Sequence, residues 1–303
     1  MSQNNQDTGF GENASQMGGR MVNRDGSFNI QRHGISVRDR VSSYHSMLTM
    51  PRWRFLLVIM IAYFLINCFF TLLYWLAGPT GLAGVDQGHG FTRIKELFFF
   101  STQTFTTVGY GRVNPVGELT NWIAAIESLI GFLSFAIAAG LLYGRFSRPR
   151  SFVRFSEKML LANYQQGKAL MFRLVGYKDD HILTNVEIKV SARLFTQDGS
   201  YQFYNLDLER SHVDSLVLNW TVVHPIDSNS PFAGLTVEQI KALQPEVSAL
   251  LIGFDEVYSS TVMARNSYAL SDLLFGFRFA PMYFRGKSNT KLDLSLLDSV
   301  EAE

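Results

Sequence analysis

The stretch FLLVIMIAYFLINCFFTLLYWLA, residues 55–77, contains no charged side chain. An α-helix rises 1.5 Å per residue, so this run is longer than the roughly 20 residues that cross the apolar core of a bilayer. Trp53 before the run, and Tyr74 and Trp75 near its end, are side chains of the kind that prefers the two membrane interfaces. The stretch therefore predicts a transmembrane helix over about residues 53–77.

A second apolar run, WIAAIESLIGFLSFAIAAGLLY, covers residues 122–143 and contains one charged side chain, Glu127. It predicts a second transmembrane helix over about residues 121–146. An ionisable group at that depth in a span indicates a functional position.

The composition indicates a chain that is part membrane protein and part soluble protein. Of 303 residues, 47% are hydrophobic and 17% are charged, and the net charge of +1 does not favour nucleic-acid binding. The only cysteine, Cys68, excludes an intramolecular disulfide. Residues 1–34 are polar and glycine-rich, and we expect a flexible cytoplasmic tail.

Basic residues flank the two spans on the sides away from the connecting loop, which predicts that both termini are cytoplasmic. These residues are Arg38, Arg40, Arg52, Arg54, Arg145, Arg148 and Arg150.

Ahead of the first span, apolar side chains recur with helical spacing at Val37, Val41, Tyr44 and Leu48. This pattern favours an amphipathic helix over residues 35–50 that lies on the inner leaflet. A basic, solvated linker is the alternative.

The loop between the spans contains IKELFFFSTQTF, residues 94–105, a mostly apolar segment that is too short to cross a bilayer. A segment that enters the membrane and turns back must bury its non-helical return in protein or let it line a water-filled cavity. The return here is TTVGYG. We therefore expect a re-entrant helix within a membrane domain over residues 51–148.

The remaining residues, 149–303, form runs typical of strands. VEIKVSARLF and YQFYNLDL flank a turn at Asp198 and Gly199, which indicates a hairpin. Four further runs are also typical of strands: ALMFRLV, SLVLNWTVV, SALLIGF and FGFRFA. Thr236 and Gln239 form a capping-box pattern that predicts a short helix over residues 236–243. Together these features predict an all-β sandwich.

TVGYG, residues 107–111, has the sequence of the filter in which backbone carbonyls of potassium channels replace the water around the ion. Gly109 and Gly111 can adopt positive φ at no steric cost, as successive carbonyls facing one axis require. The Thr107 hydroxyl can add an oxygen, and Tyr110 can brace the strand. K⁺ would bind at Thr107, Val108, Gly109 and Tyr110. In a strand of a soluble protein, the same five residues would form only a turn at the glycines.

Beyond the filter, the chain resembles the prokaryotic inward-rectifier (Kir-type, KirBac-like) potassium channels. The resemblance covers NRDGSFNIQRHG, LLYGRFSRPR, WTVVHPIDSNSPF and the GFDE and ARNSY segments. It implies a homotetramer with two transmembrane helices, a re-entrant pore helix and cytoplasmic immunoglobulin-like β-sandwiches. It also implies K⁺ as the permeant ion, no cofactor, no catalysis and a place in the cell (inner or plasma) membrane. The sequence has no helix with arginine at every third position, so we expect a voltage-independent channel.

The resemblance places the pore lining on the second helix at Gly131, Phe135, Ala139 and Tyr143. Tyr143 would form the constriction at the bundle crossing, where aromatic rings exclude water. An aromatic residue at the inner membrane interface is the alternative for Tyr143. Gly131 and Gly140 would be hinges, although glycines also permit close helix packing.

Two positions depart from the pattern of many eukaryotic relatives. Phe135 stands where those relatives carry an acidic residue that controls rectification, and Gln103 stands where they have a glutamate in the pore helix. Gln103 and Glu127 are candidates for filter support, and an interfacial position is the alternative for Glu127. Arg112 follows the filter, and the sequence assigns no role to it.

Arg145, Arg148 and Arg150 lie where the headgroups of the inner leaflet are expected, and the resemblance places phosphoinositide action at this junction. The alternative is that these arginines only set the topology. A membrane-anchored binding module with a vestigial pore is the second function considered. His224, Asp227 and Asp255 accompany no nucleophile and base, and we expect them in loop hydrogen bonds and subunit contacts.

Overall fold

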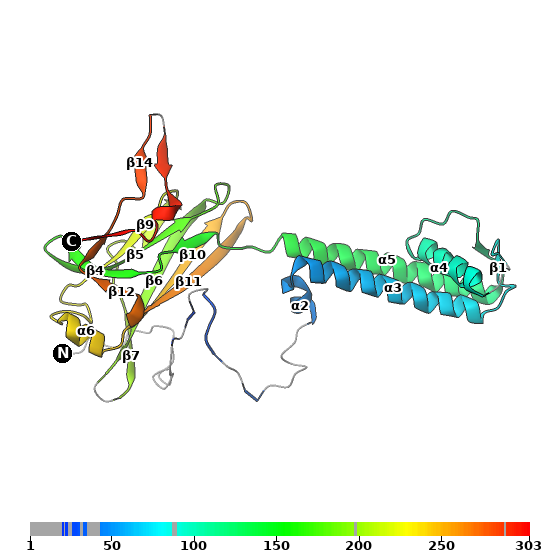
Figure 1. Cartoon of the computed structure of the whole chain (residues 1–303), viewed down its shortest axis with the longest axis horizontal. Coiled ribbons are helices and arrows are strands. Elements are labelled where there is room, and N and C mark those ends of the chain that lie inside the picture. The colour runs from blue at the N-terminus through cyan, green and yellow to red at the C-terminus, as the bar shows by residue number, and fades with distance from the viewer. Residues whose placement is uncertain are drawn as a thin grey trace. The chain divides into compact units, whose positions relative to one another are not determined.

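The structure is a computed structural model that describes residue 20 and residues 22–23, 26–30, 33–34, 43–86, 90–196, 199–287 and 289–303. The chain forms two compact units, one from Gly34–Arg148 and the other from Met1–His33 with Pro149–Glu303. Figure 1 shows a helical unit and a β-rich unit.

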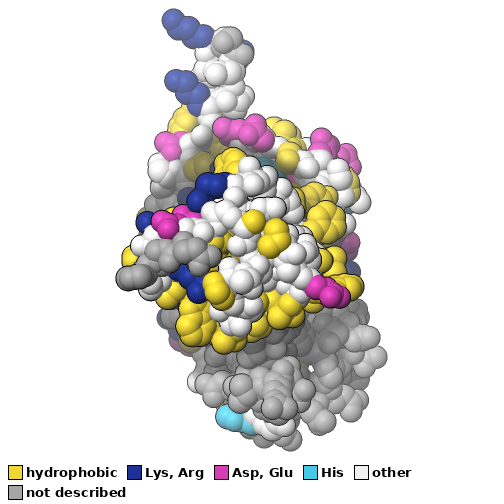
Figure 2. All heavy atoms as spheres, turned by 90° about the vertical axis from the view of Figure 1, so that its right-hand side faces the viewer, with side chains coloured by type: hydrophobic (Ala, Val, Ile, Leu, Met, Phe, Trp, Pro, Cys, Tyr) yellow, Lys and Arg dark blue, Asp and Glu magenta, His cyan; other side chains and the backbone are white. Residues whose placement is uncertain are grey.

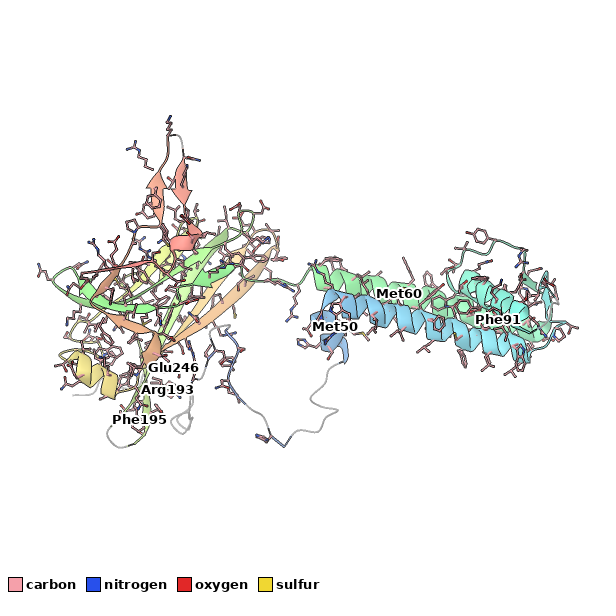
Figure 3. All side chains as sticks on the ribbon, in the orientation of Figure 1. Met50, Met60, Phe91, Arg193, Phe195 and Glu246 are labelled. Carbon is pink, nitrogen blue, oxygen red and sulfur yellow. The ribbon has the colours of Figure 1, made fainter. Side chains whose placement is uncertain are left out.

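The described part of the helical unit contains two long helices, a shorter helix between them in the sequence, and a seven-residue helix ahead of the first long one. Two strands, β1 (Leu82–Ala83) and β2 (Asn114–Pro115), form a small antiparallel ribbon in the loops. Figure 3 labels Met50 and Phe91, which lie near opposite ends of this unit. The helices are α2 (Ser43–Thr49), α3 (Arg52–Leu76), α4 (Phe91–Phe105) and α5 (Glu118–Phe146).

The long helices α3 and α5 are both long and apolar enough to cross a membrane. Only 17% and 11% of their most apolar windows are buried within the chain. Apolar surface of this extent is unfavourable in water, so it indicates contact with lipid or with other subunits. α4 has 15 residues and is too short to span.

The short helix α4 packs against α3 through aromatic side chains. The rings of Tyr74 and Phe100 meet edge to face with their centroids 5.0 Å apart, and those of Tyr63 and Phe105 do so at 5.6 Å. Tyr74 was expected at a membrane interface, and that expectation is wrong because its side chain is fully buried.

Gly131 of α5 packs directly against the end of α4. A Cβ atom at this position would lie 2.0 Å from the carbonyl oxygen of Phe105. Real Cβ atoms do not approach another atom so closely, so only glycine permits this contact. Gly140, on the same helix, has no atom within 4 Å of its ideal Cβ position.

The second unit is a sandwich of two five-stranded sheets, as the strand pattern predicts (Figure 1). One sheet has the order β11-β10-β6-β7, with β8 also paired to β6. The other has the order β12-β4-β5-β3, with β9 also paired to β5. The first sheet consists of β6 (Leu183–Phe195), β7 (Tyr201–Asn205), β8 (His212–Leu216), β10 (Glu246–Asp255) and β11 (Ser260–Ala269), and the second of β3 (Val153–Phe155), β4 (Met159–Tyr164), β5 (Gly167–Gly176), β9 (Trp220–Pro225) and β12 (Leu273–Phe275).

The inward faces of both sheets form one hydrophobic core. Its fully buried members include Phe172, Ile188, Leu251 and Tyr268. Two antiparallel ribbons and three short helical segments lie outside the sheets. They are β13 (Phe277–Phe279) with β16 (Val300–Ala302), β14 (Tyr283–Arg285) with β15 (Thr290–Leu292), α6 (Val237–Ala242), η2 (Leu270–Asp272) and η3 (Leu294–Leu296).

Strands β6 and β10 carry an ion pair across the sheet. Glu246 stands opposite Arg193 in the strand register, and Arg193 Nη2 lies 2.7 Å from Glu246 Oε2 (both labelled in Figure 3). Both side chains are buried, and the guanidinium also lies over the ring of Tyr201 at 4.3 Å. Burial of both charges requires this pairing, because an unpaired buried charge is strongly destabilising.

For the β-rich unit, the structure confirms the predicted capping box and divides two of the predicted strand runs. The capping box at the start of α6 is present, with both hydrogen bonds between Thr236 and Gln239. The run SLVLNWTVV is two strands rather than one, because β8 ends at Leu216 and β9 begins at Trp220. FGFRFA is also divided, at Gly276, which has φ of +74°.

The tail expected over residues 1–34 includes residues that pack against the β-rich unit, so flexibility of that whole segment is wrong. Val22 is buried, and Arg20 Nη1 lies 3.1 Å from the buried carboxylate of Asp272. Apolar burial and an ion pair hold these residues, which composition alone does not reveal. Val37 and Val41 of the predicted amphipathic helix lie outside the described residues.

We predict that Gly131→Ala destabilises the helical unit. The added methyl group would force α5 away from the Phe105 carbonyl, and overpacking of this kind costs about 1–3 kcal/mol. The midpoint of thermal unfolding in detergent should fall. Gly140→Ala is the control, because alanine favours helix over glycine and meets no neighbouring atom. Equal midpoints for the two variants would contradict the close contact.

Candidate functional site

The uncharged segment Thr107–Gly111 follows the C-terminus of α4 directly. Its backbone alternates, since φ is +60° at Thr107, +50° at Gly109 and +83° at Gly111. The two glycines adopt positive φ without steric cost, as expected from the sequence, whereas Thr107 is a non-glycine residue in a disfavoured conformation. The sequence analysis did not identify this feature of Thr107. Surrounding contacts must maintain such a conformation.

The inner half of this segment is bonded to the last turn of α4. The Thr107 amide donates to the Thr104 carbonyl at 3.1 Å. The amides of Val108 and Gly109 both donate to the Gln103 carbonyl, at 3.0 and 3.3 Å. Gln103 therefore contacts the segment through its main-chain carbonyl.

The outer surface of the segment is open in a single chain. The side chain of Val108 is 53% exposed and that of Tyr110 is 79% exposed. Exposed apolar and aromatic side chains of this kind indicate a surface that another molecule covers.

Glu127 lies in the packing of three helices rather than at a surface. Its carboxylate is fully buried and accepts a hydrogen bond from Tyr74 Oη of α3 at 2.6 Å. The Ser101 hydroxyl of α4 donates to its other oxygen. Ser101 Oγ also lies 3.1 Å from Oδ1 of the buried Asn67. An interfacial position for Glu127 is wrong for this structure.

Sequence reasoning missed the partners of Glu127. Tyr74 appeared as an interfacial aromatic, and Ser101 and Asn67 appeared as ordinary polar residues within apolar segments. The available signal was the polar character of Asn67 within a span, because intramembrane polar groups seek partners.

The row of residues predicted to line a pore on α5 has two environments. Gly131 is buried under Phe105, whereas Phe135, Ala139 and Tyr143 are exposed. A hollow of about 700 Å³ brings Thr107, Gly131 and Phe135 together, with Tyr143 outside its lining.

The arginines after α5 also differ from one another. The Arg145 guanidinium donates to the carbonyls of Met47 and Met50, the latter at 2.8 Å, and lies over the ring of Phe55. These carbonyls are at the end of α2, where a cation is favourable. Arg145 is thus engaged within the helical unit, which weakens its assignment to lipid headgroups. Arg148 and Arg150 are exposed.

Polar groups of the β-rich unit have structural partners. His224 Nδ1 lies 2.6 Å from the Asp207 carbonyl and Nε2 lies 2.9 Å from Ser230 Oγ, and burial lowers the pKa of this histidine. His181 Nδ1 lies 2.8 Å from Asp255 Oδ2. Within the described parts of the chain, no cluster of three or more His, Cys, Asp or Glu residues could hold a metal.

Comparisons with known proteins agree with this arrangement. Residues 153–302 match the family model of the inward rectifier potassium channel C-terminal domain, and residues 59–148 match an ion channel model. These are families of channels and not of enzymes.

Three related proteins have similar sequences. The inward rectifier potassium channel Kirbac3.1 of Paramagnetospirillum magnetotacticum is 34% identical, over 87% of this chain and 89% of its own length. Inward rectifier potassium channel 4 is 28% identical in Rattus norvegicus and 27% in Homo sapiens, each over 91% of this chain and 71% of the relative. The two apolar helices, the β-rich unit and these matches together show that the chain belongs to the inward rectifier potassium channel family.

Proposed function

We propose that the chain conducts K⁺ passively through a filter formed by Thr107, Val108, Gly109, Tyr110 and Gly111. The observation that carries the proposal is the alternation of positive φ at Thr107, Gly109 and Gly111 in an uncharged segment that follows a short helix. Alternation of this kind lets successive carbonyls face one axis, where they replace the water around a cation. The ions bind at Thr107, Val108, Gly109 and Tyr110, and no cofactor takes part.

We propose a homotetramer, because a single strand cannot surround an ion. Four copies around one axis form a closed ring, and they cover the surfaces of Val108 and Tyr110 that one chain exposes. The same assembly, together with lipid, covers the exposed apolar faces of α3 and α5.

Glu127 and Gln103 support the filter in this proposal. Glu127 fixes α4 to α3 and α5 through Ser101 and Tyr74, and Gln103 holds the inner half of the filter through its carbonyl. A fixed helix end is what a strand of positive-φ residues requires.

The gate lies at the inner end of α5. Phe135, Ala139 and Tyr143 lie on one exposed row, and four Tyr143 rings meeting on the axis would exclude water. Gly140 has free space around it and can act as a hinge. Gly131 lines the hollow below the filter, and its contact with Phe105 limits bending at that position.

Membrane lipid regulates the gate through Arg148 and Arg150, which are exposed just after α5. Anionic phospholipids, phosphoinositides included, attract each of them by about 1 kcal/mol. Arg145 acts indirectly, by fixing α2 to α5. The channel is voltage-independent and lies in the cell (inner or plasma) membrane with both termini cytoplasmic. Residues 35–50 form the interfacial segment, residues 51–148 the pore domain and residues 149–303 the regulatory domain.

Cation flux into liposomes that hold the purified protein tests the proposed function. We expect K⁺ or Rb⁺ to enter and Na⁺ to enter much more slowly, because the carbonyl cage suits dehydrated K⁺. Ba²⁺ should block the flux. Equal rates for Na⁺ and K⁺ would refute selectivity.

Tyr143→Ala should raise the basal K⁺ flux, because the smaller side chain opens the apolar constriction to water. Ile137→Ala is the control, since Ile137 is a large apolar residue with an exposure of 64%, against 74% for Tyr143, yet it lies two residues from both Phe135 and Ala139, on the other side of α5. Flux in both variants should be normalised to reconstituted protein. The gate is not at Tyr143 if its variant conducts at the wild-type rate.

Arg148→Gln with Arg150→Gln should weaken the response of K⁺ flux to phosphoinositide in the vesicles. Each arginine contributes an attraction of about 1 kcal/mol, so removal of both should raise the phosphoinositide fraction needed for the response by about tenfold or more. The control variant Arg285→Gln with Lys291→Gln removes two exposed cations from the β14–β15 hairpin. An undiminished response in the first variant would place the lipid site elsewhere.

A further inference from the structure

Arg112, the residue directly after the filter, forms an ion pair with the first half of α4. Its Nη2 lies 2.9 Å from Glu96 Oε1, and its Nη1 donates to the Gly84 carbonyl at 3.4 Å. The second Glu96 oxygen accepts a hydrogen bond from the Asp86 amide at 3.3 Å. One carboxylate therefore contacts both the segment after the filter and the loop before α4.

The two members of this pair differ in exposure. The Glu96 side chain is 16% exposed, whereas that of Arg112 is 61% exposed. Figure 2 looks onto this end of the helical unit, where acidic and basic side chains lie close together. An ion pair with one partly buried member is less screened by solvent than a fully exposed pair.

The backbone of Arg112 is also held from the loop side. Gly84 has φ of +79°, and a Cβ there would lie 1.9 Å from the Arg112 carbonyl oxygen. The ribbon begins two residues later, where Asn114 pairs with Ala83, and Val113 between them is buried. The chain after the filter is thus fixed by the loop on one side and by Glu96 on the other.

The filter itself is held unevenly. The amides of Thr107, Val108 and Gly109 bond to the end of α4. In the part of the chain that the structure describes, neither Tyr110 nor Gly111 makes a hydrogen bond within this chain. Arg112 is therefore the first fixed point beyond Gly109.

We propose that Glu96 is a positioning residue that holds the outer end of the filter through Arg112. This inference rests on the proposed function, because it concerns the selectivity of that filter. Loss of the ion pair frees the Arg112 side chain, and the carbonyls of Tyr110 and Gly111 then lose their fixed spacing. A looser cage discriminates less between K⁺ and Na⁺, whose preferred cage sizes differ.

The test compares the ratio of K⁺ to Na⁺ flux in liposomes for the full-length wild type, Glu96→Gln and Arg112→Gln. We expect the ratio to fall about two- to fivefold in each variant, as for the loss of one partly exposed ion pair. The double variant should fall no further than either single one, because the pair is already broken. The charge-swapped variant, Glu96→Arg with Arg112→Glu, should recover part of the wild-type ratio.

Two control variants change charge without touching the pair. Glu118→Gln removes an exposed acid from the start of α5, and Arg93→Gln removes a cation from α4. Both should keep the wild-type flux ratio. The ratio does not depend on the amount of protein inserted, so a variant that only folds less efficiently would leave it unchanged.

Two results would overturn the inference while leaving the proposed function intact. One is a selective wild type with unchanged ratios in both single variants. The second is a flux ratio that rises in one single variant and falls in the other variant, which would show an effect of local charge rather than of position. A wild type that passes K⁺ and Na⁺ equally would overturn the proposed function and this inference together.

Discussion

The contact between the Gly131 Cα and the Phe105 carbonyl sets how closely α5 approaches the end of α4. One helical turn earlier on both helices, Glu127 receives the Ser101 hydroxyl. The two contacts advance in the same direction along α4 and α5, so they form consecutive layers of one interface. Because the segment Thr107–Gly111 starts two residues after Phe105, this interface fixes where the segment begins. A larger residue at 131 would move both layers at once.

The buried carboxylate of Glu127 gives the same interface its specificity. A charged or polar group is costly in an apolar environment unless it is hydrogen-bonded, and the hydroxyls of Tyr74 and Ser101 provide these bonds from two other helices. These two hydrogen bonds join α3, α4 and α5 at one carboxylate. At the opposite end of α5, Arg145 binds the free carbonyls at the end of α2 in a comparable way.

Patterns along the chain were sufficient for the architecture and for parts of the site. Long apolar runs identified α3 and α5, alternation identified the strands of the sandwich, and the Thr236 and Gln239 pattern identified α6. Local patterns failed where a distant residue decides the outcome. Val22 and Arg20 lie in a polar, glycine-rich segment, yet they pack against residues more than 220 positions away. Tyr74 has the amphipathic ring of an interfacial residue, yet its side chain is buried by α4 and α5.

The sequence by itself determined the two spans, the re-entrant helix, the β-sandwich and the segment Thr107–Gly111, because periodicity, length and glycine positions are local properties of the chain. Only the tertiary structure decided the roles of side chains whose partners lie on other elements. It buried Glu127 between three helices, engaged Arg145 with α2, clamped Gly131 against Phe105 and paired Arg112 with Glu96. These contacts depend on helix packing distances and loop paths, and a single sequence does not encode them in any one stretch.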